Sequence, residues 1–594
     1  MTMLAEEKLE DIIDKNDKDL MDMVNYIKEN KSGFINNGKF KTFTLETSRG
    51  KTIGSAYAMS QSVLKGNDTK YIFTTKKLDE CKRVANIIKK ELKDITFQDK
   101  NETIVMVYTP SEKEDTLISS SDFYKCARSK ILIVTHSTYL NLCKPKTKFH
   151  EGYAENVRKY FDTLIIDEEI NAVLDNLCTF NQYIYEDTLR LIKCTNNKEI
   201  LAFYEWLCNI LKETINEYEK HNCYKNKILI AEKDDINIFP HMAYEELIES
   251  IKIIDNEVIE DFSYETERVT KSDIILRIQK LYTIYQNINF DKVLYWNESL
   301  YSCDFDFEFL MLKKNIMLDA SANFNTLYDS NIFDTVKSKR VIDHTKCYLL
   351  WHNINTSKSA KRGKSDKDQL TNFRKYIIND IKKKAKKDSE VLIITNKSEC
   401  DALDKRFIDD EFKKNFENYA FLNFFNMRGV DNFAEYKECF IIHTPRFPFP
   451  IYILMYMYYI MKEDIDIFKL DMSYGKFRGN NSIGFKDKIL DGLLFSDEIS
   501  ALYQACKRTC RNREPQGNFH VYNSNFDVIK AIQNELLNVK IIPDEDNKRA
   551  KLCEDFYFML IKIRELKYSE FSPLNVLTLK LNCSNSSTIC PDNC

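Results

Sequence analysis

The feature that most constrains the fold of this chain is a short apolar run that ends in Gly50-Lys51-Thr52. The residues Phe43-Thr44-Leu45 predict a strand, and a helical pattern begins at Ile53. A strand, a turn ending in Gly-Lys-Thr and a helix are typical of a phosphate-binding loop. In such a loop, backbone N–H groups and the lysine hold phosphates, and the threonine hydroxyl holds Mg²⁺.

Two positions of this loop depart from the usual pattern. Leu45 and Ser48 stand where glycine is usual, and a Gly-Lys-Thr triplet in a lysine-rich chain is often a coincidence. If the backbone of Ser48 is left-handed, its side chain costs about 1 kcal/mol or more. The loop therefore needs support from the rest of the chain before it can be assigned to a nucleotide site.

The size and charge of the chain limit its organisation and partners. A chain of 594 residues is too long for one hydrophobic core, so we expect about three or four domains. With 43% hydrophobic and 30% charged residues, the composition is that of an ordinary globular protein. Because the net charge is −4, any nucleic-acid binding requires a local basic surface.

Cysteine usage and hydropathy indicate the compartment. The 17 cysteines are scattered, and the N-terminus is polar and acidic, which predicts reduced thiols and no secretory signal. The most apolar run, 451–461, is too short to span a bilayer and predicts a buried helix. We therefore expect a cytoplasmic protein, in the host cytoplasm if it is viral, that is not secreted and binds no membrane.

Two later segments repeat the pattern of a strand, a loop and a helix. The runs 70–77 and 131–140 predict buried strands with polar residues at their carboxyl ends, namely Thr75 with Lys76 and Thr135 with His136. Sheets of this class place ligands at that edge. Taken alone, the 70–77 segment is more typical of a solvated loop, and a lone histidine such as His136 could be a satisfied core residue.

A pair of carboxylates ends a third predicted strand. The residues Phe161-Asp-Thr-Leu-Ile-Ile lead directly to Asp167 and Glu168. A Mg²⁺-dependent nucleotide hydrolase needs one carboxylate near the metal and another that positions or deprotonates the attacking water. Adjacent carboxylates usually mark a solvated turn, but their position at the end of a buried strand downstream of Gly-Lys-Thr favours the catalytic interpretation.

At this point the chain resembles the superfamily 2 helicases of the DExD/H-box type. Segment 313–323, with Ser321, is similar to motif III, and 390–397, with Thr395, is similar to motif IV. The run Arg428-Gly-Val-Asp431 resembles motif V. Motif VI is matched by Gln504, Arg508 and Arg511, with Lys507 where glycine is usual. The order of these segments is more specific than any one of them.

The resemblance implies a role for each matched residue. The nucleotide would be held by Ser48, Arg49, Gly50, Lys51, Thr52, Gly429 and Asp431, the metal by Thr52 and Asp167, and catalysis would use Glu168, Gln504, Arg508 and Arg511. Nucleic acid would contact Thr75, Lys76, Thr135, His136 and Thr395. The implied cofactors are ATP and Mg²⁺, and arginines such as Arg508 would reach the γ-phosphate across a cleft.

The predicted fold class is α/β, with two tandem RecA-like (P-loop) motor domains and a mostly helical insertion in the first. The expected units are 1–39, a helical extension; 40–175 plus 305–335, the ATP-binding domain; 176–304, the insertion; 340–540, the second motor domain; and 541–594, a helix and a cysteine-containing tail. Within the insertion and after it, 292–312 predicts two strands and a return helix, and 518–523 predicts the last strand of the second sheet.

Helicases with an arch domain and an iron–sulfur cluster have a similar insertion, but they carry four cysteines before motif II. Here the corresponding region offers Cys81, Cys126 and Cys143 at wide spacing, so we predict no cluster. The tail cysteines Cys583, Cys590 and Cys594 could bind zinc with a fourth ligand, although a disordered tail is the more common meaning of such a pattern.

The sequence therefore predicts an ATP-dependent helicase or translocase acting on single- or double-stranded nucleic acid, with DNA favoured over RNA. Protein partners in a replication, repair or defence complex would fit this activity. Two alternatives stay open. One is a degenerate helicase fold that binds nucleic acid or serves as a scaffold without efficient hydrolysis, and the other is a translocase that moves on duplex without separating strands.

Overall fold

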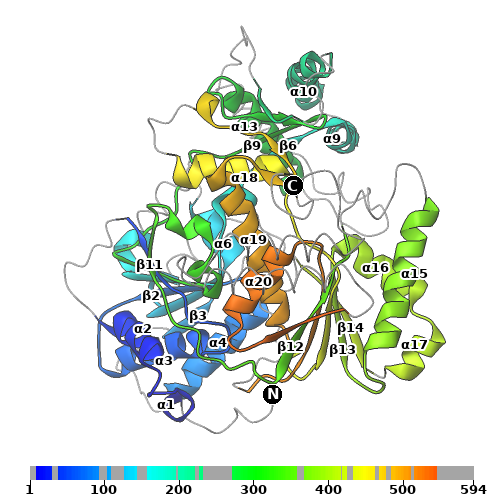
Figure 1. Cartoon of the computed structure of the whole chain (residues 1–594). Coiled ribbons are helices and arrows are strands. Elements are labelled where there is room, and N and C mark those ends of the chain that lie inside the picture. The colour runs from blue at the N-terminus through cyan, green and yellow to red at the C-terminus, as the bar shows by residue number, and fades with distance from the viewer. Residues whose placement is uncertain are drawn as a thin grey trace, which may run out of the picture.

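The structure is a computed structural model of the chain. It describes residues 9–29, 38–92, 104–108, 126–143, 157–194, 198–220, 227–231, 271–356, 367–416, 418–424, 433–461, 467–476, 483–509 and 514–544. Two α/β units lie side by side, and a third group of elements around α9, α10 and α13 lies across one end of them (Figure 1). Gly429, Asp431, Arg511 and the three tail cysteines lie outside the described residues.

The first unit is built on a seven-stranded parallel sheet with the order β11-β1-β10-β5-β2-β4-β3. Its strands are β1 (Phe40–Phe43), β2 (Tyr71–Thr75), β3 (Val105–Val107), β4 (Ile131–Thr135), β5 (Thr163–Asp167), β10 (Lys314–Leu318) and β11 (Phe333–Val336). The strands β2, β5 and β10 are buried throughout, as parallel strands covered on both faces must be. The strands predicted near 43, 71, 131 and 163 are confirmed.

Helices cover both faces of this sheet. The helices are α1 (Leu9–Ile12), α2 (Lys18–Lys28), α3 (Lys51–Leu64), α4 (Leu78–Glu91) and α6 (His136–Cys143). Helices α1 to α4 lie in one buried cluster and α6 lies in another. The buried face of α2 packs against α3 at Gly54, where a Cβ atom would lie 3.0 Å from Leu20 and 3.1 Å from Met23. The N-terminal extension is therefore packed against the helix that follows the Gly-Lys-Thr turn.

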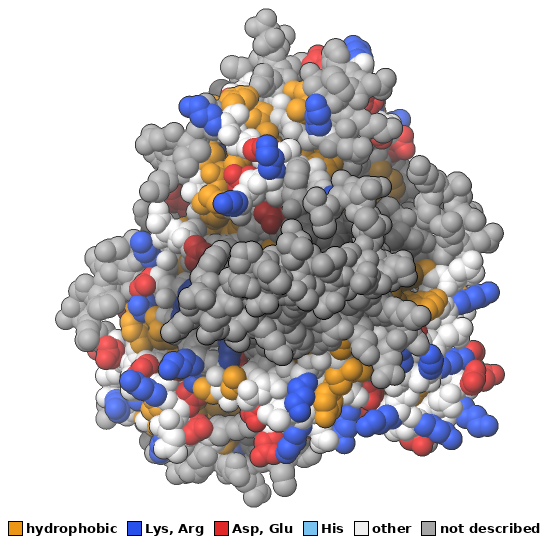
Figure 2. All heavy atoms as spheres, in the orientation of Figure 1, with side chains coloured by type: hydrophobic (Ala, Val, Ile, Leu, Met, Phe, Trp, Pro, Cys, Tyr) orange, Lys and Arg blue, Asp and Glu red, His pale blue; other side chains and the backbone are white. Residues whose placement is uncertain are grey.

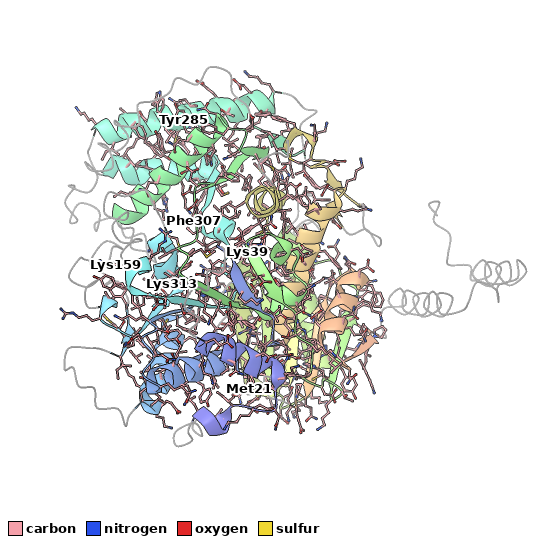
Figure 3. All side chains as sticks on the ribbon, turned by 90° about the vertical axis from the view of Figure 1, so that its left-hand side faces the viewer. Met21, Lys39, Lys159, Tyr285, Phe307 and Lys313 are labelled. Atoms are coloured by element: carbon pink, nitrogen blue, oxygen red, sulfur yellow. The ribbon has the colours of Figure 1, made fainter. Side chains whose placement is uncertain are left out.

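The insertion between β5 and β10 combines helices with an antiparallel sheet. Its elements are α8 (Ala172–Asp175), β6 (Leu177–Phe180), α9 (Gln182–Cys194), α10 (Lys198–Glu219), β7 (Leu229–Ile230), α13 (Lys271–Ile288), β8 (Leu294–Trp296) and β9 (Ser299–Cys303), with the strand order β6-β9-β8-β7. Figure 3 shows Tyr285 of α13 at the opposite end of the molecule from Met21 of α2.

Helices and strands share one core in this insertion. The helices α9, α10 and α13 and the strands β6, β8 and β9 contribute to the same buried cluster. The two strands predicted in 292–312 are confirmed, but the predicted return helix is wrong. Residues 304–313 contain no helix, because the alternating run Phe305, Phe307 and Phe309 follows a period of two rather than 3.6.

The second unit is a six-stranded parallel sheet with the order β14-β13-β15-β18-β12-β19. Its strands are β12 (Cys347–His352), β13 (Val391–Thr395), β14 (Tyr419–Asn423), β15 (Glu438–Ile441), β18 (Gly517–Tyr522) and β19 (Lys540–Pro543), and its helices are α15 (Lys367–Lys384), α16 (Lys397–Phe407), α17 (Asp410–Asn415), α19 (Lys488–Cys506) and α20 (Phe526–Glu535). The prediction that 518–523 forms the last strand is wrong, because β19 follows it at the edge of the sheet.

A segment inserted between β15 and α19 packs on the first unit. Its elements are α18 (Phe449–Met455), the π-helix η5 (Tyr456–Ile460), η6 (Ile467–Lys469), β16 (Tyr474–Gly475) and β17 (Gly484–Phe485). The Tyr459 hydroxyl accepts from the Ala172 amide at 2.7 Å, and the Tyr458 hydroxyl donates to the Phe307 carbonyl at 2.7 Å. The apolar run is therefore a buried helix, as predicted.

The surface carries mixed charge. Figure 2 shows lysine and arginine side chains intermingled with aspartate and glutamate over the lower part of the face in view, which agrees with a net charge of −4. In the part of the chain that the structure describes, no helix has the length and apolar character needed to cross a membrane.

Candidate active site

The predicted phosphate loop lies between the end of β1 at Phe43 and the start of α3 at Lys51. Gly50 is the N-cap of α3 and has a φ of 81°, and Ser48 has a φ of 78°. Two left-handed residues turn the chain so that the first turn of α3 faces the loop. The unpaired N–H groups of a helix N-terminus and its dipole favour bound phosphate at this place.

Ser48 therefore has the left-handed backbone conformation that is strained for a residue other than glycine. Its hydroxyl oxygen is buried and has no hydrogen-bond partner within the described residues. A buried polar atom of this kind costs free energy unless a ligand satisfies it. The loop thus has an unsatisfied hydroxyl where a phosphate group would bind, and this observation supports the fit of a nucleotide.

Replacing Ser48 with glycine is expected to stabilise the nucleotide-free protein by about 1 kcal/mol, because glycine adopts positive φ without the steric cost that serine bears. The free energy of unfolding from urea titration measures this change. The matched control is Ser60→Gly in the interior of α3, which should destabilise by about 1 kcal/mol. A destabilised Ser48→Gly variant would contradict the left-handed assignment.

Lys51 is directed back onto its own loop. Its ammonium donates to the Leu45 carbonyl at 2.7 Å and lies 3.4 Å from the Glu46 carbonyl oxygen. Burial lowers the pKa of Lys51 to about 8, and the carboxylates of Asp167, Asp319 and Glu168 oppose that shift in this order. The lysine is therefore close to the acidic end of β5 and held at the loop by carbonyl oxygens that a phosphate could replace.

Thr52 and Asp167 form a close contact between the two halves of the site. The Thr52 hydroxyl donates to the Asp167 Oδ2 at 2.6 Å and joins the start of α3 to the end of β5. Burial raises the pKa of the Asp167 carboxyl to about 7, and the Thr52 hydrogen bond opposes this shift. A hydroxyl and a carboxylate oxygen are the hard ligands that Mg²⁺ prefers. The two residues predicted to hold the metal are thus brought together.

Glu168 follows Asp167 in an unusual backbone conformation. Its φ is 74°, and its amide donates to the Leu318 carbonyl of β10 at 3.0 Å. A non-glycine residue at positive φ costs on the order of 1 kcal/mol and occurs preferentially at functional sites. The ladder of β5 and β10 therefore continues to Glu168 and fixes where this carboxylate leaves the sheet.

The motif III segment supplies an acidic residue that the sequence analysis did not single out. Asp319 caps the 3₁₀-helix η3 (Ala320–Asn323), and its Oδ2 accepts from Ser321 at 2.7 Å and from Tyr328, in the following 3₁₀-helix η4 (Thr326–Asp329), at 2.6 Å. The negative charge of Asp319 also raises the pKa of Lys51, against the effect of burial. The signal was present, because Asp319 ends an apolar strand just as Asp167 does.

The C-terminal end of α19 brings Gln504 and Arg508 to the boundary between the two units. The Arg508 guanidinium is fully buried and donates to the Gln504 side-chain oxygen at 2.9 Å and to its carbonyl at 3.2 Å. The pKa of Lys77 is lowered, mainly by burial and to a smaller extent by the positive charge of Arg508, and the Glu168 carboxylate opposes this shift. Arg508 of the second unit and Glu168 of the first therefore both act electrostatically on Lys77.

The predicted nucleic-acid residues fall into different environments. Thr75 and Thr135 are register partners at the carboxyl ends of β2 and β4, and Lys76 is exposed beside them. The His136 Nε2 instead lies 3.0 Å from the Asp167 carbonyl oxygen, so this buried ring supports the end of β5. Thr395 ends β13 in the other sheet and is fully buried.

Arg49 is turned away from the phosphate loop. Its guanidinium forms a two-pronged ion pair with Asp17, the N-cap of α2, with the Nε–Oδ2 contact at 2.8 Å, and donates to the Lys339 carbonyl at 3.1 Å. Its backbone amide donates to Glu46 at 3.3 Å. The side chain therefore fastens the loop to the N-terminal helix and to the segment after β11.

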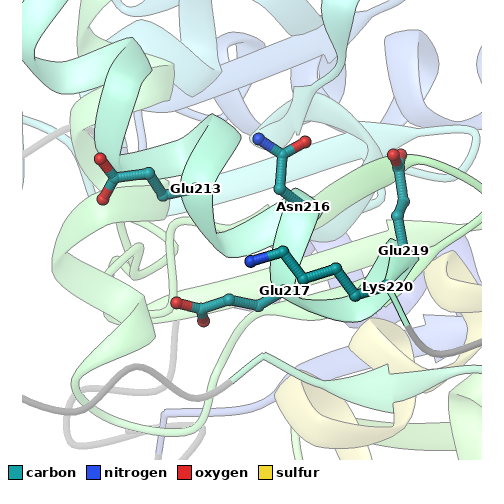
Figure 4. A pocket seen from close by; sticks show the side chains of 5 residues that line it. All are labelled: Glu213, Asn216, Glu217, Glu219 and Lys220. Atoms are coloured by element: carbon teal, nitrogen blue, oxygen red, sulfur yellow. The ribbon is translucent and has the colours of Figure 1, made fainter.

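A hollow elsewhere on the molecule has the wrong charge for phosphate. It lies at the end of α10 and is lined by Glu213, Asn216, Glu217, Glu219 and Lys220 (Figure 4). Three carboxylates and one lysine give this hollow a net negative charge, which would repel a nucleotide.

The cysteines considered for a cluster, Cys81, Cys126 and Cys143, are buried free thiols. The absence of an iron–sulfur cluster stays a prediction.

Comparison with solved structures relates this geometry to known folds. A structure named XPD helicase superimposes with a TM-score of 0.53 at 10% sequence identity, covering 89% of this chain and 98% of that chain. The chain therefore has the overall fold of this helicase structure. The seven-stranded and six-stranded sheets correspond to two tandem RecA-like units, which confirms the predicted α/β class and its two motor domains.

Two further solved structures align less closely. The S. tokodaii protein Xpd4 has a TM-score of 0.47 at 10% identity, with 88% of this chain and 99% of that chain covered. S. cerevisiae Dbp5 bound to RNA and ADP BeF3 has a TM-score of 0.34 at 10% identity, with 93% and 99% covered. No family model and no curated protein sequence matches the chain.

Proposed function

We propose that this protein is an ATP-dependent nucleic-acid motor, a helicase or translocase that hydrolyses ATP between its two RecA-like units. The observation that carries the proposal is the 2.6 Å contact between Thr52 and Asp167 beside Lys51. It joins the helix that follows the phosphate loop to the acidic end of β5, and a Mg²⁺–ATP hydrolase needs these groups together.

The chain's own residues would divide the work as follows. Lys51 and the first-turn amides of α3 would bind the phosphates, and Thr52 with Asp167 would hold Mg²⁺. The bound metal supplies positive charge that neutralises phosphate oxygens. Glu168, held at a φ of 74°, would orient and deprotonate the attacking water. Arg508, with Gln504 as its hydrogen-bond partner, would contribute positive charge from the second unit.

Single-stranded nucleic acid would cross the carboxyl edges of the two sheets. Thr75 and Thr135 form a polar pair on the first sheet, and Lys76 is exposed next to them. These groups suit a sugar–phosphate backbone, which accepts hydrogen bonds from hydroxyls and ammonium groups. We favour DNA over RNA, with assembly into a larger replication, repair or defence complex.

One observation favours a second function. Ser48 takes the left-handed conformation that glycine adopts at lower cost, and such a departure is expected in a degenerate member that binds ATP without efficient turnover. In that case the fold would act as a nucleic-acid-binding or scaffold subunit. The two functions differ in whether Glu168 matters for turnover.

Steady-state ATP turnover with single-stranded DNA, duplex DNA, RNA and no nucleic acid tests the proposal. Turnover should rise when the preferred strand is added, and Glu168→Gln should lower it by roughly 10²-fold or more because the general base is lost. The matched control is Glu169→Gln, the adjacent carboxylate. ATP binding without strand-stimulated turnover, unchanged by Glu168→Gln, would favour the scaffold function instead.

A further inference from the structure

The segment that joins the two motor units runs along the phosphate loop. It spans residues 337–346, between the end of β11 and the start of β12, and contains neither helix nor strand. The Ser338 amide donates to the Thr44 hydroxyl at 2.8 Å, and the Arg340 guanidinium donates to the Thr44 carbonyl at 3.2 Å. The interdomain linker is therefore hydrogen-bonded to the residues that lead into the loop.

Glu46 is the centre of these contacts. This loop residue is fully buried, and its Oε2 accepts from the Val341 amide at 2.6 Å and from the Ile342 amide at 3.2 Å. Two consecutive N–H groups that converge on one carboxylate oxygen form a small anion-binding concavity. Bonds to a charged acceptor are also stronger than neutral ones. Glu46 thus fixes the linker to the loop at one point.

The opposite oxygen of Glu46 faces the second unit. Its Oε1 lies 3.7 Å from the Lys507 ammonium, and both side chains are almost completely buried. The same ammonium donates to the His344 Nε2 at 3.1 Å. Lys507 is the residue that stands where motif VI usually has glycine. A lysine at this position thus has a defined partner in the phosphate loop of the other unit.

Two arginines hold the linker on either side of Glu46. Arg49, from the loop itself, donates to the Lys339 carbonyl at 3.1 Å. Arg340, from the linker, donates to the Ala320 carbonyl at 2.9 Å and pairs with Glu535 of the second unit at 2.7 Å. The loop, motif III and the second unit are thereby connected through a few charged side chains.

We propose that Glu46 is a positioning residue that anchors the interdomain linker to the phosphate loop and, through Lys507, sets the orientation of the second motor unit relative to the nucleotide site. Movement of the loop when phosphate enters shifts the acceptor of the Val341 and Ile342 amides. The linker follows, and Lys507 moves with α19, which also carries Gln504 and leads into Arg508. This inference rests on the proposed ATP-dependent function and names how occupancy of the site reaches the other unit.

Single-molecule energy transfer between dyes at Lys89 and Lys405 tests the proposal in the full-length chain. Both residues are exposed, one on α4 of the first unit and one on α16 of the second. Non-canonical amino acids carry the dyes, because the chain has 17 cysteines. The probe nucleotide is the Mg²⁺ complex of AMPPNP, and its Kd is measured on the same samples.

In the unaltered chain the nucleotide should shift the transfer efficiency. Glu46→Ala should broaden the nucleotide-free distribution, abolish the shift, and weaken AMPPNP binding about 5-fold or more, the usual scale of coupling between sites. Glu46→Gln keeps an acceptor oxygen for the two amides but leaves the Lys507 charge unpaired. It should show a smaller loss than Glu46→Ala. Adding Lys507→Met to Glu46→Gln removes the buried unpaired charge, so it should restore the melting temperature but not the shift in transfer efficiency.

The matched control is Glu514→Gln, which breaks the exposed ion pair between Glu514 and Lys346 at the end of the linker and should change neither the shift nor the Kd. A Glu46→Ala protein that folds and responds to AMPPNP as the unaltered chain does would overturn the proposal. If the unaltered chain bound no nucleotide, the proposed function would fail separately. The distribution of transfer efficiencies without nucleotide would then test the anchor alone. A broader distribution in both Glu46 variants would support the anchor, and an unchanged width would refute it.

Discussion

Replacing Lys51 with methionine is expected to lower ATP turnover by about 10²–10³-fold, the usual cost of removing one preorganised donor to developing charge. Methionine has about the length of lysine and fills the same space, but it cannot hydrogen-bond to phosphate oxygens. Because the ammonium donates to loop carbonyls at 2.7 and 3.4 Å, it is already at the loop and needs little reorganisation. Steady-state turnover at saturating strand and ATP measures the loss.

The stability of this variant separates a chemical role from a structural one. Burial lowers the pKa of Lys51 to about 8, below its unfolded value. Between about pH 8 and 10.5 the unfolded chain therefore binds more protons at Lys51 than the folded chain does. Below pH 8 the buried charge of Lys51 lowers the free energy of unfolding by its full amount. Lys51→Met should thus not lower the melting temperature at pH 7. Lys65→Met, at the exposed end of α3, is the control and should leave turnover unchanged. A large loss of stability together with normal turnover in the folded fraction would contradict the assignment.

The parallel sheets could be predicted because burial on both faces produces continuous apolar runs. The strands ending at Thr75, Thr135 and Asp167 have this pattern, and each ends in polar residues at the carboxyl edge. The pairing of Thr52 with Asp167 was implied by the family resemblance, and the sheet explains it, since the loop after β1 and the end of β5 meet at one edge. Short edge strands gave no such signal. β19 is half exposed, and most of it falls within 541–594, a range predicted to form a helix and a tail.

The contacts between the units could not be predicted from the local pattern. Glu46 and Lys507 are far apart in the sequence, and each alone resembles an ordinary charged surface residue. Only the fold shows that both are buried and face each other at 3.7 Å. Arg49 illustrates the same limit, because its place in the loop suggested phosphate binding, whereas its side chain pairs with Asp17. Long-range ion pairs depend on how units pack, and no periodicity encodes them.

Arg508→Ala is expected to reduce ATP turnover by about 10³–10⁵-fold, the range by which an arginine finger accelerates phosphoryl transfer. Its guanidinium donates to the Gln504 side-chain oxygen at 2.9 Å and, like Glu168, influences the pKa of Lys77. Nucleotide binding then requires only that this guanidinium be redirected toward the phosphate. Single-turnover hydrolysis and AMPPNP affinity should be measured together, because the chemical step should slow much more than binding weakens.

A buried arginine can also matter only for stability, and two further variants separate these roles. Arg508→Lys keeps the charge but loses the planar pair of donors, so turnover should fall while the melting temperature falls less than in Arg508→Ala. Arg374→Ala removes another well-buried arginine of the same unit, paired with Glu399 at 2.7 Å. It should lower stability and leave turnover per folded molecule unchanged. If Arg508→Ala behaved as Arg374→Ala does, the guanidinium would be a structural clamp at the end of α19, and the positive charge for hydrolysis would have to come from elsewhere in the second unit.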